Sequence, residues 1–157
     1  MRHGDADTPA STDDERELTK KGRKVTAAMG QLLKARGFDV PELIVTSPLP
    51  RAEQTARIMA EEFAADARFE INDGLRSGKD MEIAMSVIAA KRNEVHTLMI
   101  VGHDPTLSRL ASALVSGQDT PAIEMKKSSV TIFEITRFHV PGMRGVLRAY
   151  LPPKVAV

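Results

Sequence analysis

Two short apolar runs, each followed by a proline-containing loop and a helical pattern, constrain the fold of this chain most strongly. LIVTS spans 43–47 and stops at Pro48, and TLMIVGH spans 97–103 and stops at Asp104 and Pro105. Strands that are apolar on both faces are typical of parallel sheets covered by helices on both sides. The pattern predicts a three-layer α/β/α sandwich with a mostly parallel central sheet.

Helical spacing fills the stretches between these strands. Gly37 and Gly117 stand where a left-handed residue ends a helix, and Asp104 with Pro105 is predicted to supply the N-cap and first turn of the last helix. Apolar residues at 128–135 and 146–151 flank a PGMRG turn and indicate a closing hairpin. The segments with helical spacing are 19–36, 51–63, 80–88 and 107–114.

Length and charge limit the function classes. The 157 residues suffice for one core, so a single domain over 1–157 is predicted. The net charge of +1 lacks the basic excess of a nucleic-acid-binding protein, and no apolar run approaches a membrane span. We therefore expect a cytoplasmic protein without nucleic-acid or membrane partners. Because cysteine is absent, thiolate metal sites and a thiol nucleophile are excluded.

Cationic and imidazole side chains follow the predicted strands. Arg51 and His103 lie in the two loops after LIVTS and LMIVG, and Arg2 with His3 would form a third such loop. In open α/β sheets the ligand lies beyond the carboxyl ends of the strands. Arginine binds pairs of phosphate oxygens, and the neutral imidazole of His3 or His103 can attack phosphorus. These loops predict a phosphoryl-transfer site that requires no metal or other cofactor.

The start of the chain raises a difficulty for this interpretation. With only Met1 before Arg2, the strand that should lead into the first loop is missing from the sequence. A catalytic side chain must be placed to within ~0.5 Å, which needs support from rigid neighbouring structure. Either native residues upstream of Met1 are missing or the site is poorly ordered, and we expect the former.

Three motifs together resemble a known family. MRHGDAD, SPLPRAEQTA and VGHDP resemble, in order and approximate spacing, the signature segments of the RHG branch of the histidine phosphatase superfamily, from Arg2 to about Ile135. The short length and the ELTKKG segment are most similar to SixA-type phosphohistidine phosphatases. The resemblance implies a phosphoglycerate-mutase-like fold, with His3 as nucleophile, Arg2 and Arg51 as ligands of the phosphoryl oxygens, and His103 completing the pocket.

The resemblance also raises the question of a general acid. Larger family members use a carboxylate to protonate the leaving oxygen, and Asp5, Asp80 and Glu82 are the candidates here. An imidazole leaves more readily than an alkoxide and depends less on such an acid. The lack of a clear counterpart therefore favours phosphohistidine on a protein over a sugar phosphate.

Three alternative functions stay open. A small-molecule phosphomonoesterase or mutase of the same superfamily is the nearest, although the connection over 63–80 is too short for a lid over a metabolite. A metal-dependent phosphohydrolase could use His3, Asp5, His103 and Asp104, although no H-x-x-x-H pattern gathers ligands. A non-catalytic domain that binds phosphorylated partners is the third.

Overall fold

Two sheets form the framework of the computed structural model, which describes residues 1–8, 12–63, 68–120 and 122–157. A parallel sheet has the strand order β2-β1-β3, and a separate antiparallel hairpin pairs β4 with β5. The strands are β1 (Leu43–Thr46), β2 (Arg68–Ile71), β3 (Leu98–Val101), β4 (Val130–Arg137) and β5 (Arg144–Leu151).

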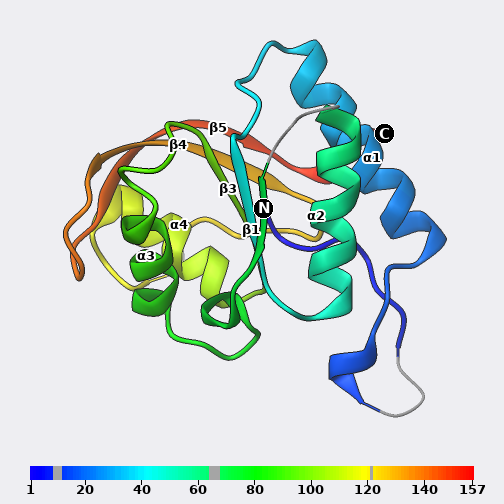
Figure 1. Ribbon diagram of the computed structural model, residues 1–157, viewed down its shortest axis with the longest axis horizontal. Helices are drawn as coiled ribbons and strands as arrows, with labels where there is room; N and C mark the ends of the chain where they lie inside the picture. Colours follow the sequence, from blue (N-terminus) through cyan, green and yellow to red (C-terminus); the bar gives the residue numbers. More distant parts are fainter. Residues whose placement is uncertain (9–11, 64–67, 121) are drawn as a thin grey trace.

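Helices cover both faces of the parallel sheet. Figure 1 shows α1 (Lys20–Ala35) and α2 (Pro50–Phe63) on one side of β1 and β3, with α3 (Met81–Ala90) and α4 (Thr106–Ser116) on the other. Successive side chains of a strand point to opposite faces. Accordingly Ile44 packs in the core with α1 and α2, whereas its neighbours in β1 pack in the core with α3 and α4. The predicted three-layer α/β sandwich is confirmed.

Local signals set several helix ends, of which the two glycine ends were predicted. The Thr19 hydroxyl caps α1 by accepting the N–H of Gly22 at 2.8 Å. Gly37 and Gly117 adopt φ angles of +71° and +79°, the left-handed conformation that favours glycine at a helix end. The predicted hairpin is also present, as β4 and β5.

Two details of the prediction were wrong. Asp104 does not cap α4: Pro105 occupies the N-cap position, and the Asp104 carboxylate instead accepts a hydrogen bond from the Ser108 hydroxyl one turn into the helix. The strand β2 was not predicted. Its four residues are half-buried or exposed, and their apolar pattern is too short to indicate a strand.

Backbone hydrogen bonds hold the N-terminal segment between the two sheets. Arg2 forms a parallel bridge with Gly102, just after β3; the His3 N–H donates to the Gly102 carbonyl at 3.1 Å, and the Gly102 N–H donates to Met1 at 3.2 Å. On the other side, the Ser128 N–H donates to the His3 carbonyl at 3.0 Å. These bonds supply the support for His3 that the sequence did not reveal.

No helix in the described ranges has the length and apolar character that crossing a membrane would need.

Candidate active site

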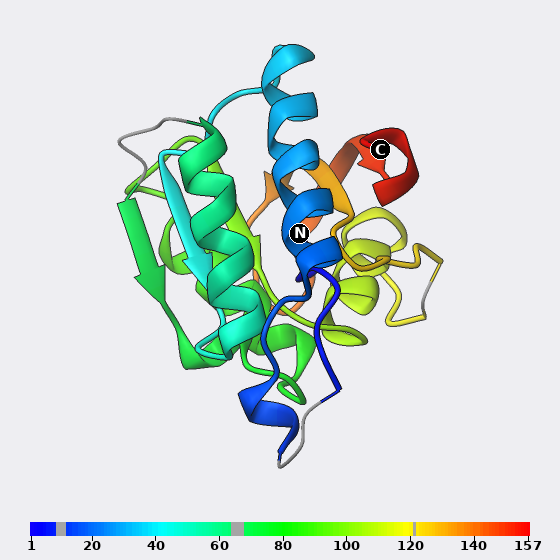
Figure 2. The same cartoon turned by 90° about the vertical axis from the view of Figure 1, so that its right-hand side faces the viewer.

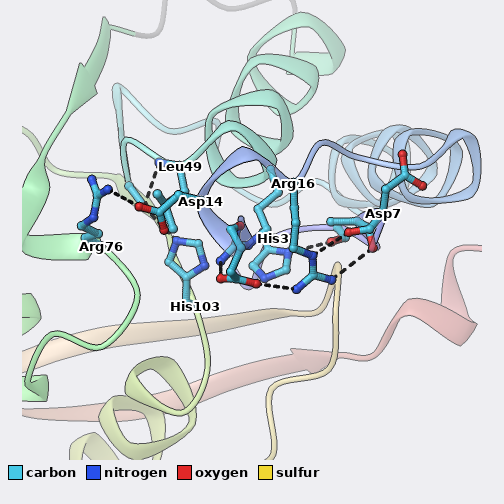
Figure 3. Close-up of polar contacts among 12 residues, drawn as sticks. His3, Asp7, Asp14, Arg16, Leu49, Arg76 and His103 are labelled. Carbon is cyan, nitrogen blue, oxygen red and sulfur yellow. Dashed lines mark hydrogen bonds and ion pairs between the residues drawn. The ribbon is translucent and has the colours of Figure 1, made fainter. Parts of the chain in front are cut away.

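The four predicted side chains meet at the carboxyl edge of the parallel sheet. His103 follows β3, Arg51 lies in the first turn of α2 after β1, and Arg2 and His3 lie on the N-terminal segment. The ring centroids of His3 and His103 are 5.1 Å apart, and Figure 3 shows the two rings side by side. Both arginines act electrostatically on both histidines. The structure therefore brings all four groups together.

The environment of His3 fixes which of its ring nitrogens is available. The side chain is buried, and its Nδ1 lies 2.7 Å from the carbonyl oxygen of Gly4. A carbonyl oxygen only accepts hydrogen bonds, so the proton of the neutral ring lies on Nδ1. Nε2 then carries the free electron pair that a nucleophile needs.

Thr55 connects the His3 loop to the helix that carries Arg51. Its hydroxyl accepts the N–H of Gly4 at 2.9 Å and donates to the Arg51 carbonyl at 2.7 Å. A side chain at Gly4 would have no room on this loop, because a Cβ there would lie 2.8 Å from the Thr26 hydroxyl oxygen. Glycine thus permits the close packing that fixes the loop beside α1 and α2.

In His103 the ring nitrogen without a partner in the described ranges is Nδ1, whereas in His3 it is Nε2. Nε2 of His103 lies 2.8 Å from the hydroxyl oxygen of Ser47, which also accepts the N–H of Leu49 at 3.2 Å. When this hydroxyl donates its proton to Nε2, the proton of the neutral ring lies on Nδ1. Nδ1 is buried and has no hydrogen-bond partner among the described residues. Ser47 was not among the predicted site residues, because a serine directly after a strand is more often a turn residue.

Both arginines are anchored at their terminal nitrogens. An Nη of Arg2 donates to the Met125 carbonyl at 2.7 Å, and both Nη atoms of Arg51 donate to Asp13. The two Nε atoms are buried without a partner in the described part of the chain. Together with Nδ1 of His103 they give the four site residues three unused donors, which suits a tetrahedral oxyanion.

Burial keeps both imidazoles neutral at pH 7. Desolvation lowers the pKa of His3 from 6.5 to about 4; its bond to Gly4 opposes this shift, and the nearby arginines add to it. Desolvation also lowers the pKa of His103 to about 3, with further contributions from His3 and Arg51. A neutral ring is the form that can attack phosphorus or donate from Nδ1.

The three candidate acids lie elsewhere. Asp5 accepts a hydrogen bond from Lys127 at 2.7 Å, and this contact lowers the pKa of its carboxyl group. Asp80 and Glu82 lie at the start of α3, where their charges act on Arg109. Among the described residues, none of the three carboxylates makes a hydrogen bond or ion pair with either histidine. Their role as general acid stays a prediction.

The carboxylate that does reach the site is Asp13, which sequence reasoning missed. Its Oδ2 lies 2.9 Å from an Nη atom of Arg51, and its charge also acts on His103. Asp13 begins a 3-10 turn, Asp13–Glu15, which Figure 2 shows in dark blue below the lower ends of α1 and α2. The acidic DDE sequence was visible, but nothing in its spacing pointed to an arginine 38 residues later.

Two cavities differ in how they relate to the site. A cavity of about 640 Å³ lies between β3 and β4, and none of the four site residues lines it. A smaller one of about 420 Å³ is lined by Arg2, Asp5 and Lys127. In the ranges that the structure describes, no three His, Asp or Glu side chains are grouped so that they could hold a metal ion.

Comparisons with known proteins agree on one family. The model of the histidine phosphatase superfamily (branch 1) matches residues 1–82. The phosphohistidine phosphatase SixA of Escherichia coli (strain K12) is 29% identical over 136 residues, covering 85% of this chain and 84% of that protein. The SixA homolog of Haemophilus influenzae is 28% identical over 121 residues, covering 73% and 74%.

Solved structures extend the likeness to nearly the whole chain. The protein histidine phosphatase SixA complexed with tungstate superimposes with a TM-score of 0.85 at 26% identity, covering 99% of this chain and 96% of that one. A mycobacterial glucosyl-3-phosphoglycerate phosphatase reaches a TM-score of 0.71 at 20% identity, covering 94% and 95%. The second likeness concerns the fold alone.

Proposed function

The chain belongs to the histidine phosphatase superfamily, and from this premise we propose that it hydrolyses phosphohistidine on a protein, with His3 as the nucleophile. Arg2, Arg51 and His103 would bind the phosphoryl oxygens. The observation that carries the proposal is the set of three buried, unused donors of Arg2, Arg51 and His103, together with the free Nε2 of His3.

The reaction has two displacements at phosphorus. Nε2 of His3 attacks, the bond between phosphorus and the substrate imidazole breaks with its electron pair, and the leaving nitrogen takes up a proton from solvent. A water molecule then attacks the phosphorus on His3, releasing inorganic phosphate and restoring the neutral ring. Three N–H donors at the oxygens stabilise the charge as each bond changes.

Two observations support an imidazole leaving group on a protein. Alkoxide departure calls for a proton donor, whereas Asp5 is held ionised by Lys127 and the other two candidate acids have no contact with the histidines. The similar SixA proteins are named as phosphohistidine and protein histidine phosphatases. An imidazole is the leaving group that such a pocket can release.

Initial rates on three substrates test this function. We expect kcat/KM to be highest for a phosphohistidine-carrying protein, lower for phosphoramidate and at least ~100-fold lower for phosphoglycerate, a loss of ~3 kcal/mol of transition-state stabilisation. Rates should be unchanged in excess chelator, which serves as the control against a metal-dependent reaction. A preference for phosphoglycerate, or loss of activity with chelator, would overturn the proposal.

The acid limb of the pH profile is a second expected result. Because the pKa of His3 is lowered to about 4, the neutral nucleophile persists above that pH and is lost as the pH falls through it. We expect kcat/KM for phosphoramidate to decline near pH 4, after correction for the ionisation of the substrate measured by phosphorus NMR.

Circular dichroism at each pH provides the control for this profile. Between pH 6.5 and about 4 the unfolded chain takes up protons at His3 and His103 that the folded chain does not, so the free energy of unfolding falls. A decline centred near pH 6.5 in a fully folded protein would contradict the assignment of His3.

A further inference from the structure

We propose that Asp13 is a positioning residue for Arg51, holding the guanidinium so that its Nε faces the phosphoryl group. This inference rests on the proposed function of Arg51. One Nη of Arg51 donates to the Asp13 carbonyl at 2.6 Å and the other to the Asp13 carboxylate at 2.9 Å. Two bonds to one residue fix both the place and the plane of the guanidinium, and leave Nε as its unused donor.

Arg51 needs such a partner more than an ordinary arginine does. It is 2% exposed and lies in the first turn of α2, where the helix end already carries partial positive charge. A buried cation without a counter-charge is strongly unfavourable. Within the described ranges, Asp13 is the carboxylate paired with Arg51.

The Asp13 carboxylate is itself held from the other side. Its Oδ1 accepts a hydrogen bond from Arg16 at 2.9 Å, and Arg16 also donates to the carbonyls of Asp7 at 2.6 Å and Ala6 at 3.2 Å. These contacts tie the 3-10 turn to the chain that follows His3. The residue that holds Arg51 is therefore bonded, through Arg16, to the chain segment that follows the nucleophile His3.

The neighbouring Asp14 pairs with Arg76 instead of Arg51, and because both side chains are exposed this ion pair contributes little to holding the turn. Asp14 accepts a hydrogen bond from Arg76 at 2.6 Å, beside β2 in the chain. Figure 3 shows Asp14 reaching Arg76 on one side of His103 and Arg16 beside Asp7 on the other side of His3. Asp13 is therefore the residue of this turn that contacts Arg51.

A carboxylate beside a phosphoryl pocket has a cost as well as a use. Its charge repels the dianion, and it occupies one Nη of Arg51 that could otherwise bind an oxygen in the ground state, while the other Nη donates to the backbone carbonyl of Asp13. Removing the carboxylate should leave the guanidinium held by the carbonyl alone and let it bind phosphate in several orientations, of which few suit the transition state. The expected signature is a lower kcat without weaker phosphate binding.

Two variants and one matched control test this. For Asp13→Ala we expect kcat on phosphoramidate to fall ~10- to 100-fold, while KM and the inhibition constant of inorganic phosphate stay equal or decrease. Asp13→Asn keeps an acceptor and should lose less. Asp14→Asn removes the same charge from the same turn but contacts Arg76 rather than Arg51, and should stay within ~2-fold of the unaltered chain.

The outcomes separate this inference from the proposed function. Unaltered kcat in Asp13→Ala, an equal loss of kcat and phosphate affinity, or an equal loss in Asp14→Asn would overturn the positioning role while leaving the phosphatase intact. Absence of turnover by the unaltered chain on every phosphorylated substrate would overturn the proposed function and this inference with it. Thermal unfolding of each variant verifies that all are folded.

Discussion

Replacing His3 with alanine is expected to reduce turnover of a phosphohistidine protein by at least ~10³-fold, because the proposed covalent intermediate forms on Nε2 of this ring. Nε2 of His3 carries the free electron pair, and buried donors of Arg2, Arg51 and His103 are unused. Those donors belong to other residues, so the variant should still bind inorganic phosphate. Initial rates and phosphate titration measure the two properties separately.

Trapping the intermediate gives the direct test of the same residue. A brief reaction of the unaltered chain with a phosphorus-32-labelled substrate should leave an acid-labile, base-stable label on the protein, and His3→Ala should carry none. His139→Ala is the matched control, because this histidine is exposed and lies outside the site. A labelled His3→Ala protein would remove His3 as the nucleophile, and phosphate binding without any label in the unaltered chain would indicate a binding domain.

The second large effect is expected for Arg51→Ala, which removes a buried positive charge and the Nε donor together. We expect kcat/KM to fall ~10²- to 10³-fold, the range measured when a transition-state donor is removed. Unlike the Asp13 variants, Arg51→Ala should also weaken competitive inhibition by inorganic phosphate. Arg51→Lys keeps the charge without the planar fork and should recover little of the loss.

Arg57→Ala is the matched control for this position. Arg57 lies on the same helix but is exposed and pairs with Glu53, so its loss should change kcat/KM by less than ~2-fold. Equal phosphate affinity in Arg51→Ala and the unaltered chain would contradict a phosphoryl-binding role for Arg51. Thermal unfolding is needed beside the kinetics, because Arg51→Ala also leaves the Asp13 carboxylate without one partner.

Periodicity predicted the layers of the fold, and the loops after the carboxyl ends of the strands predicted where polar side chains would gather. Arg51 and His103 each follow a parallel strand of one sheet, so their meeting is a consequence of geometry. The predicted N-cap of α4 was wrong because residue type alone does not decide which contact a carboxylate makes. Asp104 has the residue type of a cap, but its carboxylate bonds to the Ser108 hydroxyl, a choice that only the three-dimensional packing decides.

Contacts between loops could not be predicted from periodicity or from the positions of the strands. The bonds of Arg51 to Asp13 and of His103 to Ser47 join segments 38 and 56 residues apart, and neither has a repeating pattern. The support of His3 by Gly102 and Ser128 likewise comes from backbone groups, which every sequence contains. Residue types therefore predicted which side chains lie in the candidate site, and the contacts that orient those side chains required coordinates.

Because His3 lies between the two sheets, the orientation of its imidazole depends on how the sheets are placed relative to each other. Its backbone N–H is hydrogen-bonded to Gly102 at the end of the parallel sheet, and its carbonyl to Ser128 just before the hairpin. A sliding movement of the hairpin relative to the parallel sheet would tilt the imidazole before it disturbed the interior of either sheet. A remote change in the hairpin could therefore silence the enzyme while leaving all of its polar pocket residues unaltered.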